Sequence, residues 1–372
     1  MKTKTIINKN ITNNSNRYRF LGFAGVADLN NIDFTVPRRF EKLKPWQVTG
    51  LTDGEGSFIC TISDTGKGVT GKVVNLEFKV TQKSHSMGIL YELQEFFNCG
   101  SVVIDNRETD TKKYRIKSLE SILEKIIPHF ESYPCLTSKY LNYRDWKKIA
   151  LIMKNKEHLT IEGINKIIEI SSKMNKARSF EDKYNYCKTS LGMTTAPSIS
   201  SLDKIKVQQN SEGEGSTVEI KYNLPCHWVQ TYLTGESMFY TYLGEKKSRG
   251  IVYQGCDSSL ELGQNSHDVA ILLSLKKFFN GGYIKPKYNY DNLYECLNSR
   301  SLNRYILRNT ETIIKFVDKY PMLTRKHLDY LDWKKIVELK SRGAHKTEEG
   351  LALIKEIISK VNSPKEDVNL NI

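Results

Sequence analysis

The sequence lacks the features of several protein classes. Its 372 residues include only seven cysteines and nine prolines. The cysteines are odd in number and form no CxxC pair, which argues against a disulfide scaffold and a zinc site and for a reducing compartment. No apolar run approaches the roughly 18 residues that a membrane span needs, so we expect a soluble protein.

Acidic residues are also scarce relative to basic ones. Lys and Arg number 56 against 42 Asp and Glu, which gives a formal net charge of +14. Such an excess attracts polyanions, so nucleic acid is the first partner that the composition indicates, although the charge could also serve solubility alone. No acid precedes Asp28, and the basic residues 1–44 are expected to be flexible. A transit peptide is the less favoured interpretation, because the segment has few Arg, little Ser and weak amphipathicity.

One stretch, WQVTGLTDGEGSF at 46–58, predicts a helix that ends at an acid. Pro45 suits a helix start, and glycines interrupt the helix on both sides of Glu55. Gly50 and Gly54 lie four residues apart on one face, where a second helix could approach closely. A single glutamate between glycines would ordinarily be no more than a helix end.

The chain contains a second copy of this stretch, WVQTYLTGESMF at 228–239. A gap-free alignment of the two copies places Glu55 on Glu236 and Gly54 on Gly235. Two such helices packed about a pseudo-twofold axis would bring the glutamates together, and two carboxylates can share divalent cations. The duplication therefore turns a weak signal into a specific one.

The repeat extends well beyond the two helices. The matching segments are QKSH at 82–85 with QNSH at 264–267, FFNCG at 96–100 with FFNGG at 278–282, YPCLT at 133–137 with YPMLT at 320–324, and DWKKI at 145–149 and 332–336. Their spacing differs only slightly between the copies, which indicates small loop insertions in one fold. We therefore expect two similar domains, each long enough to bury a core.

Alternation of apolar and polar residues predicts the local structure of each repeat. In the first repeat we expect strands over 58–63 and 76–81, a helix over 87–97, strands near 102–104 and 113–117, and a helix over 118–130. The order αββαββα predicts an α+β fold whose helices cover one face of an antiparallel sheet. The other face, with its mostly polar alternation, suits contact with a nucleic-acid groove.

These helices and the duplicated framework resemble the LAGLIDADG homing endonucleases, and more narrowly their single-chain, two-motif members encoded in organellar introns. The resemblance covers most of residues 45–176 and 225–362. It implies two pseudo-twofold-related αββαββα domains whose antiparallel sheets form a DNA-binding saddle. We expect a flexible extension at 1–44, domains at 45–176 and 225–363, a linker at 177–224 and a tail at 364–372. A further GEGS at 213–216 follows a segment too polar for a buried helix, and we interpret it as linker.

The resemblance implies a metal-dependent site for phosphodiester hydrolysis between the two helices. In the family the last acid of each motif binds metal, so Glu55 and Glu236 are the expected ligands of Mg²⁺ (or Mn²⁺). The carbonyl groups of Gly54 and Gly235 are expected as additional ligands. The other expected catalytic residues are the water-ordering Gln82 and Gln264 and the phosphate-stabilising Arg115, Lys117 and Arg308. Polar strand ends and a solvated basic face are the alternative interpretations of these two groups.

By the family pattern, base recognition belongs to the open face of the first two strands in each half. The expected DNA-contacting residues are Ile59, Thr61, Ser63, Val73, Asn75, Glu77, Lys79, Tyr240, Tyr242, Ser258 and Glu261. The second motif departs from the family at Thr231, Thr234 and Ser237. Thr231 places a β-branched side chain opposite Gly50, which predicts weaker interface packing and slower or lost cleavage.

These expectations describe a monomeric, site-specific homing endonuclease that cuts both strands of a long DNA duplex. One alternative is an RNA maturase that assists splicing, with group I intron RNA as its partner. Another is a cleavage-inactive nucleic-acid-binding relative. The presence of both Glu55 and Glu236 favours the nuclease. We expect a mitochondrial, organelle-encoded protein that needs no membrane.

Overall fold

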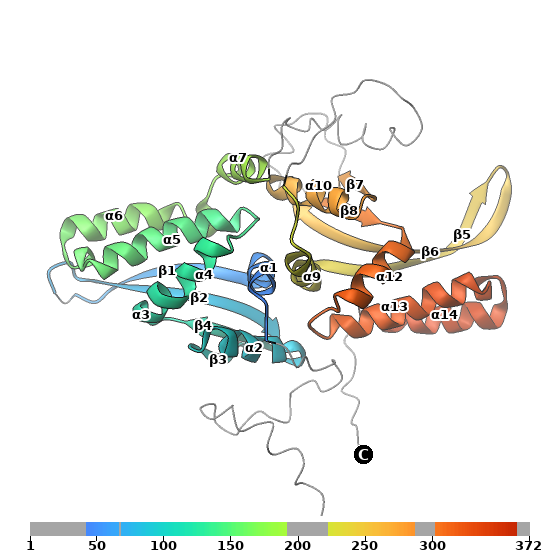
Figure 1. The fold of residues 1–372 in the computed structure, drawn as a ribbon, viewed down its shortest axis with the longest axis horizontal. Coiled ribbons are helices and arrows are strands. Elements are labelled where there is room, and N and C mark those ends of the chain that lie inside the picture. Colours follow the sequence, from blue (N-terminus) through green and yellow to red (C-terminus); the bar gives the residue numbers. More distant parts are fainter. Residues whose placement is uncertain (1–41, 67, 192–221, 287–301, 363–372) are drawn as a thin grey trace, which may run out of the picture.

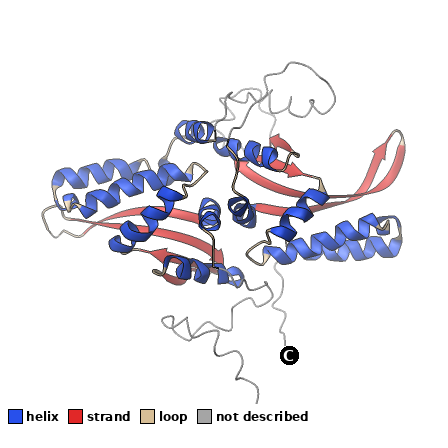
Figure 2. Cartoon of the chain, in the orientation of Figure 1, coloured by secondary structure: helices blue, strands red, loops and turns tan. Residues whose placement is uncertain are grey.

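The computed structural model describes residues 42–66, 68–191, 222–286 and 302–362, which form two similar bodies side by side (Figure 1). Each body is built on a four-stranded antiparallel sheet, with strand order β1-β2-β4-β3 in the first and β5-β6-β8-β7 in the second. Helices flank the strands in both bodies (Figure 2). The predicted α+β fold is confirmed.

The first body follows the predicted order and continues it with two further helices. Its elements are α1 (Pro45–Glu55), β1 (Gly56–Asp64), β2 (Lys72–Lys83), η3 (Ser84–Ser86), α2 (Gly88–Phe97), β3 (Ser101–Asn106), β4 (Thr111–Ile116), α3 (Leu119–Ser121), η4 (Ile122–Ile126), α4 (Ile127–Ser132), α5 (Lys139–Lys154), η5 (Glu157–Leu159), α6 (Ile161–Ser172) and η6 (Asn175–Ala177). Pro45 occupies the first turn of α1, where its missing N–H costs no hydrogen bond.

The second body repeats this order. Its elements are α9 (Cys226–Glu236), β5 (Ser237–Ser248), β6 (Ile251–Asn265), η7 (Ser266–Asp268), α10 (Val269–Phe278), β7 (Tyr283–Pro286), β8 (Leu302–Leu307), α12 (Thr310–Lys319), α13 (Lys326–Ser341), η8 (Ala344–Lys346) and α14 (Glu348–Lys360). The expected linker contains a helix, α7 (Phe180–Ser190), which packs against η7 and α10 of the second body. The GEGS copy at 213–216 lies outside the described residues.

Each sheet buries one face under its helices through an aromatic cluster. Phe58 on β1 lies 5.2 Å from Phe130 and 5.3 Å from Trp146, measured between ring centroids. At the equivalent place in the second body, Phe239 lies 5.5 Å from Trp333. Replacing such a buried ring by alanine typically costs about 3–5 kcal/mol. The helical cover is thus held in the same way in both halves, and the opposite face of each sheet stays open.

The end of each repeat is fixed to its first strand by an asparagine. Asn175 donates its side-chain N–H to the carbonyl of Phe58 at 3.1 Å, and its backbone N–H to Asn142 at 2.9 Å. Asn362 donates in the same way to the carbonyl of Phe239 at 2.6 Å. Both asparagines have a left-handed backbone, with φ values of 55° and 57°. The duplication therefore extends to the last turn of each repeat.

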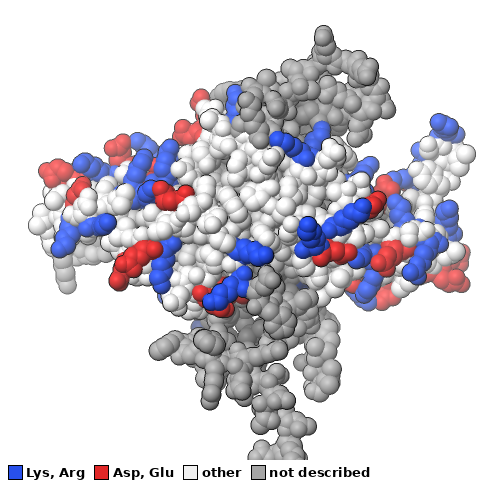
Figure 3. Space-filling view, viewed as in Figure 1, with Lys and Arg blue, Asp and Glu red and all other residues white. Residues whose placement is uncertain are grey.

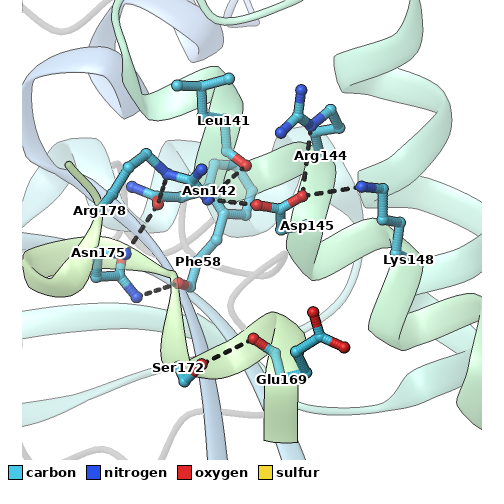
Figure 4. Close-up of polar contacts among 10 residues, drawn as sticks. All are labelled: Phe58, Leu141, Asn142, Arg144, Asp145, Lys148, Glu169, Ser172, Asn175 and Arg178. Carbon is cyan, nitrogen blue, oxygen red and sulfur yellow. Dashed lines mark hydrogen bonds and ion pairs between the residues drawn. The ribbon is translucent and has the colours of Figure 1, made fainter. Parts of the chain in front are cut away.

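The first body has an additional anchor, a buried arginine just after this asparagine (Figure 4). Arg178 forms an ion pair with Asp145 and also donates to the carbonyl of Leu141 at 3.3 Å. Arg144 and Lys148 contact the same carboxylate from the solvent side, at 3.3 Å and 3.2 Å. These contacts fix the point at which the chain leaves the first body for α7.

The outer helices carry charges of both signs. In the view of Figure 3, Lys and Arg lie among Asp and Glu over α5 and α6 and again over α13 and α14. Some of these form equivalent ion pairs, such as Lys147 with Glu131 at 2.6 Å and Lys334 with Asp318 at 2.8 Å. Exposed pairs of this kind contribute about 0–1 kcal/mol each. Among the described helices, none is long and apolar enough to cross a bilayer.

Candidate active site

Helices α1 and α9 lie side by side between the two bodies (Figure 1). At Gly50 their backbones almost touch, because a Cβ there would lie 2.3 Å from Oγ1 of Thr231 and 2.4 Å from the carbonyl oxygen of Trp228. The Thr231 hydroxyl turns back onto its own helix and donates to the carbonyl of His227 at 3.2 Å. The side chain that was expected to crowd the interface therefore occupies the space that Gly50 leaves.

Polar side chains join the two helices further along this interface. Gln47 donates to Gln230 at 2.8 Å, and the Trp228 indole donates to the carboxylate of Asp53 at 2.8 Å. Asp53 also accepts the backbone N–H of Leu136 at 2.8 Å. All of these groups are buried, so the hydrogen bonds fix the relative position of the helices as well as their contact.

Glu55 and Glu236 are the last residues of α1 and α9, and each lies against a glycine of the other helix. A Cβ on Gly54 would lie 3.6 Å from Oε1 of Glu236, and a Cβ on Gly235 would lie 3.6 Å from Oε1 of Glu55. Both glutamates are partly buried. The two acids that the sequence paired are therefore brought to one place.

Their surroundings disfavour two negative charges unless positive charge compensates. Burial, and then the charge of Glu55, raises the pKa of Glu236 to about 7. Burial also raises the pKa of Glu55, while the charges of Lys139 and Lys326 act in the opposite direction on both acids. Burial lowers the pKa of Lys326 itself to about 8. Such coupled shifts are typical of binding and catalytic sites.

The two lysines were not predicted as site residues. Lys139 begins α5 and donates to the carbonyls of Thr52 and Gly54 at 2.7 Å and 3.3 Å. Lys326 begins α13 and donates to the carbonyl of Gly235 at 3.2 Å. The signal for them is in the duplicated sequence, because each stands two residues after the threonine of the YPCLT or YPMLT match. The glycine carbonyls expected as metal ligands thus already accept from an ammonium group.

The two predicted glutamines contact the acids. Gln264, near the end of β6, donates to Oε2 of Glu236 at 3.0 Å. Gln82, near the end of β2, hydrogen-bonds Glu55. Each half therefore places one carboxylate, one amide and one ammonium group around the C-terminal ends of α1 and α9.

Comparison with known proteins agrees with this arrangement. The chain matches the family model described as LAGLIDADG endonuclease over residues 48–150 and 232–337. The chain belongs to this family. The two matched regions each contain one of the acids and its lysine.

Curated relatives with similar sequences are described as intron-encoded. Probable intron-encoded endonuclease 2 of Neurospora crassa is 28% identical over 324 residues, which cover 87% of this chain and 66% of the relative. Probable intron-encoded endonuclease 3 of the same fungus is 27% identical over 86% of this chain and 54% of its own length. An uncharacterised 50.9 kDa protein in ND4 intron 1 of Podospora anserina is 32% identical over 34% of this chain and 28% of its own length. The chain thus spans less than two thirds of the length of each of these three relatives.

Solved structures show a similar fold. I-SmaMI bound to uncleaved DNA target in the presence of calcium ions is 26% identical, with a TM-score of 0.66, and the match covers 87% of this chain and 100% of that one. The I-LtrWI LAGLIDADG homing endonuclease bound to target DNA is 25% identical, with a TM-score of 0.67 over 86% of this chain and 97% of that one.

The predicted phosphate-stabilising cations of this LAGLIDADG protein make other contacts. Lys117 is 3.3 Å from the carboxylate of Glu77, and Arg308 lies over the ring of Tyr283 at 5.4 Å. Arg115 pairs in register with Lys79 in the sheet. Within the described ranges no hydrogen bond or ion pair joins Arg115, Lys117 or Arg308 to the two acids, and the nearby cations are Lys139 and Lys326.

In the first half, the predicted DNA-contacting residues share the open face of the sheet. They are Ile59, Thr61 and Ser63 on β1 and Val73, Asn75, Glu77 and Lys79 on β2, which alternate with buried or partly buried residues of the helical side. Two of them are engaged by neighbours, because Glu77 lies 3.3 Å from Lys113 and Lys79 lies 3.5 Å from Asp105. The remaining side chains leave polar groups available at this surface.

In the second half, the prediction for Ser258 was wrong. Ser258 lies on the helical side of β6, is 4% exposed and makes a 3.1 Å hydrogen bond with Thr241. The cross-strand pair of Phe239 with Leu260 fixes which face each residue takes, and a shift of one residue exchanges the faces. Asp257 and Ser259 therefore occupy the open side, where Ser259 is itself only 4% exposed. Ser258 and Glu261 are three residues apart on one strand, so they could not both face this side.

The other residues predicted to contact DNA in the second half, Tyr240, Tyr242 and Glu261, all lie on the open face but differ in exposure. Tyr240 and Tyr242 are 40% and 38% exposed. Glu261 is on the open side but only 5% exposed, and it accepts from Arg304 at 3.1 Å and from Ser259 at 3.1 Å. The carboxylate of Glu261 is thus already satisfied by protein groups and holds an arginine in place.

Proposed function

We propose that this protein is a site-specific double-stranded DNA endonuclease encoded in an intron, which hydrolyses phosphodiester bonds with divalent metal ions. The observation that carries the proposal is the placement of Glu55 and Glu236 against Gly235 and Gly54 at the ends of two touching helices. Membership of the LAGLIDADG endonuclease family supports it, as do the DNA-bound structures of similar proteins.

The donor set fits a hard divalent cation. Two carboxylates from opposite halves share one site, and the pKa of Glu236, raised to about 7, reports the need for a positive partner. The protein would supply the two carboxylates, and water and phosphate oxygens would complete the ligand set. Mg²⁺ prefers such a set, and when bound it would neutralise charge at phosphorus and activate water.

Protein groups have separate roles in this proposal. Gln264 holds Glu236 in place through its 3.0 Å hydrogen bond, and Gln82 does the same for Glu55. The ammonium groups of Lys139 and Lys326 place positive charge beside the scissile phosphate. Lys326, whose pKa is about 8, is protonated at neutral pH and is suited to donate a proton from Nζ to the leaving oxygen.

The same proposal covers partner, assembly and origin. The two open sheet faces would contact one long DNA duplex, and a monomer suffices because one chain supplies both acids. We propose domains at 45–176 and 225–363 joined by a linker at 177–224. The relative in ND4 intron 1 supports an origin in a mitochondrial intron.

Two variants test this function directly. The substrate is a duplex that spans the uninterrupted insertion site of the intron, with Mg²⁺ present. Glu55→Gln and Glu236→Gln should each reduce double-strand cleavage by at least about a thousandfold and leave DNA affinity within about threefold, because they remove a charged ligand and keep the side-chain shape. Ca²⁺ in place of Mg²⁺ should give binding without cutting.

An exposed glutamate provides the matched control. Glu124→Gln, on the surface of η4, should cleave like the parent protein. Undiminished cleavage by the Glu236→Gln protein would remove the second half of the proposed site. Tighter binding of the folded intron RNA than of any duplex would instead favour the maturase.

A further inference from the structure

Strands β1 and β5 begin directly after the two acids and occupy equivalent positions, but their open faces differ chemically. The residues that alternate along this face are Ser57, Ile59, Thr61 and Ser63 on β1 and Met238, Tyr240, Tyr242 and Gly244 on β5. Met238, Tyr240 and Tyr242 are 38%, 40% and 38% exposed. A methionine and two tyrosine rings therefore stand in the second half where the smaller Ser57, Ile59 and Thr61 stand in the first.

The spacing of these side chains matches a DNA groove. Alternate residues of a strand advance by about 6.7 Å, which equals about two base-pair steps. Met238, Tyr240 and Tyr242 thus cover about six base pairs outward from Glu236. Further out on the same face, Tyr253 is also exposed, at 48%.

The polar end of Tyr242 is turned back onto its own strand at the surface. Its hydroxyl donates to the carbonyl of Glu245 at 3.2 Å, and the ring passes over Gly244, where a Cβ would lie 2.8 Å from the hydroxyl oxygen. Gly244 pairs in register with Gly255. Because both are glycines, neither has a side chain that could cover the Tyr242 ring. What Tyr242 presents to the open side is the apolar ring.

Cations flank this apolar row and suit the phosphates of a bound duplex. Arg304 is held by Glu261 at 3.1 Å, and Arg308 lies over Tyr283. Lys246 is within 5.6 Å of the Tyr242 ring centroid and forms an ion pair with Asp257, which stands opposite Tyr242 on β6. An apolar strip between positive groups is complementary to a major groove whose walls are phosphate and whose floor carries methyl groups.

Thymine is the base that offers such a group. In the major groove its C5-methyl is an apolar contact, whereas purine N7, O6 and N6 and cytosine N4 require hydrogen-bonding partners. Resting on the proposed function, we propose that the second domain recognises thymine methyl groups in its half-site. The first domain reads its own half mainly through hydrogen bonds from the polar side chains that share its face with Ile59 and Val73, such as Thr61 and Asn75. The two halves of one target are thereby read by different chemistry.

Uracil substitution measures the methyl contribution alone. Duplexes that bind the full chain in Ca²⁺ are selected from a randomised pool, and thymines are then replaced by deoxyuridine in one half at a time. In the second-domain half, each contacted thymine should lose about fourfold in affinity when its methyl is removed, the equivalent of one buried methylene. In the other half the same replacement should change affinity less than twofold.

Exchange of side chains assigns the halves. A protein with Met238→Ser, Tyr240→Ile and Tyr242→Thr carries the β1 face on β5, and its uracil effect in the second-domain half should fall to the less than twofold expected in the first-domain half. The single variant Tyr242→Thr should lose part of it, and Thr61→Ser in the first domain should leave it intact. Because the exchanged side chains are exposed, the melting temperatures should stay within a few degrees of the parent.

The outcomes separate this inference from the proposed function. Equal uracil effects in both halves, absence of thymine from one selected half, or a uracil effect that survives the triple exchange would overturn methyl recognition while specific binding stands. Failure to select any specific duplex would overturn both.

Discussion

The two central helices, α1 and α9, have the same length and the same final acid, but they contribute different residues to their interface. Helix α1 carries Gly50 where α9 carries Thr231, so one helix supplies the space that the other fills. Closer to the acids both carry glycine, Gly54 and Gly235, and there the helices contribute equally. A twofold-like interface therefore needs symmetry only where its chemistry is shared, and the rest can be complementary.

The residue two places before each acid shows the same division. Asp53 of α1 is a buried carboxylate that accepts from Leu136 at 2.8 Å and from the Trp228 indole of the other half at 2.8 Å. Its counterpart Thr234 accepts the backbone N–H of Leu323 at 3.3 Å. The carboxylate of Asp53 therefore joins the two halves, whereas the hydroxyl of Thr234 bonds only within its own half.

The largest effect is expected from filling the space at Gly50. A leucine there would place Cβ 2.4 Å from the Trp228 carbonyl, which cannot move without displacing α9. We expect Gly50→Leu to cost more than about 3 kcal/mol of unfolding free energy and to abolish cleavage, because the acids separate. Urea unfolding and plasmid cutting measure the two effects.

Gly88→Leu is the control for this substitution. It lies at the start of α2, where an added Cβ meets no atom within 4 Å. It should cost less than about 1 kcal/mol. If Gly50→Leu were as mild as Gly88→Leu, the helices would not be packed as the comparison requires.

The next effect distinguishes the charged anchor from the hydroxyl. Asp53→Ala leaves the Leu136 N–H and the Trp228 indole N–H buried without an acceptor, so we expect a loss of roughly 3 kcal/mol. Thr234→Ala removes one weaker acceptor and should cost about 1 kcal/mol. Thermal unfolding of both variants measures the difference, and equal losses would remove the asymmetry between the halves.

Much of the architecture could be predicted because the sequence contains two copies of the same motifs. The alternation from Leu76 to Val80 predicted a strand of the sheet, and the duplicated glycine and glutamate predicted the helix pair. The face of Ser258 was predicted wrongly although the sequence indicated it, because Leu260 and Leu262 mark the apolar side of the strand and residue 258 lies on that side by alternation. Lys139 and Lys326 were missed because charge at a helix start is ordinary, and only the folded chain shows their approach to the acids.

A smaller effect is expected from removing the lysines one at a time. Lys326→Met and Lys139→Met keep the apolar stem and remove the charge near Glu55 and Glu236. Each should lower the cleavage rate by about a hundredfold with little change in binding. The dependence of the cleavage rate on pH distinguishes Lys326 from Lys139. The pKa of Lys326, about 8, predicts that the parent protein loses activity above that pH. A parent profile that stays flat to pH 10 would remove Lys326 as a proton donor.

The smallest effect concerns the stability of the metal-free protein. The pKa of Glu236 is about 7 in the folded chain against an ordinary 4.5, because of burial and the charge of Glu55. Below pH 4.5 the carboxyl is protonated in both states and its stabilising contribution is fully present. That contribution is lost as pH rises to and through 7, since the unfolded chain releases the proton more easily.

Glu236→Gln should therefore be more stable than the parent at pH 8 in EDTA, by about 1–2 kcal/mol, and equally stable at pH 4.5. Adding Mg²⁺ or Ca²⁺ at pH 8 should raise the melting temperature of the parent more than that of the variant, because the ion replaces the missing positive partner. Glu124→Gln, an exposed control, should follow the parent at both pH values. A Glu236→Gln protein that is less stable than the parent at pH 8 would mean that this carboxylate is satisfied by the protein alone, and the two halves would then differ in their need for metal.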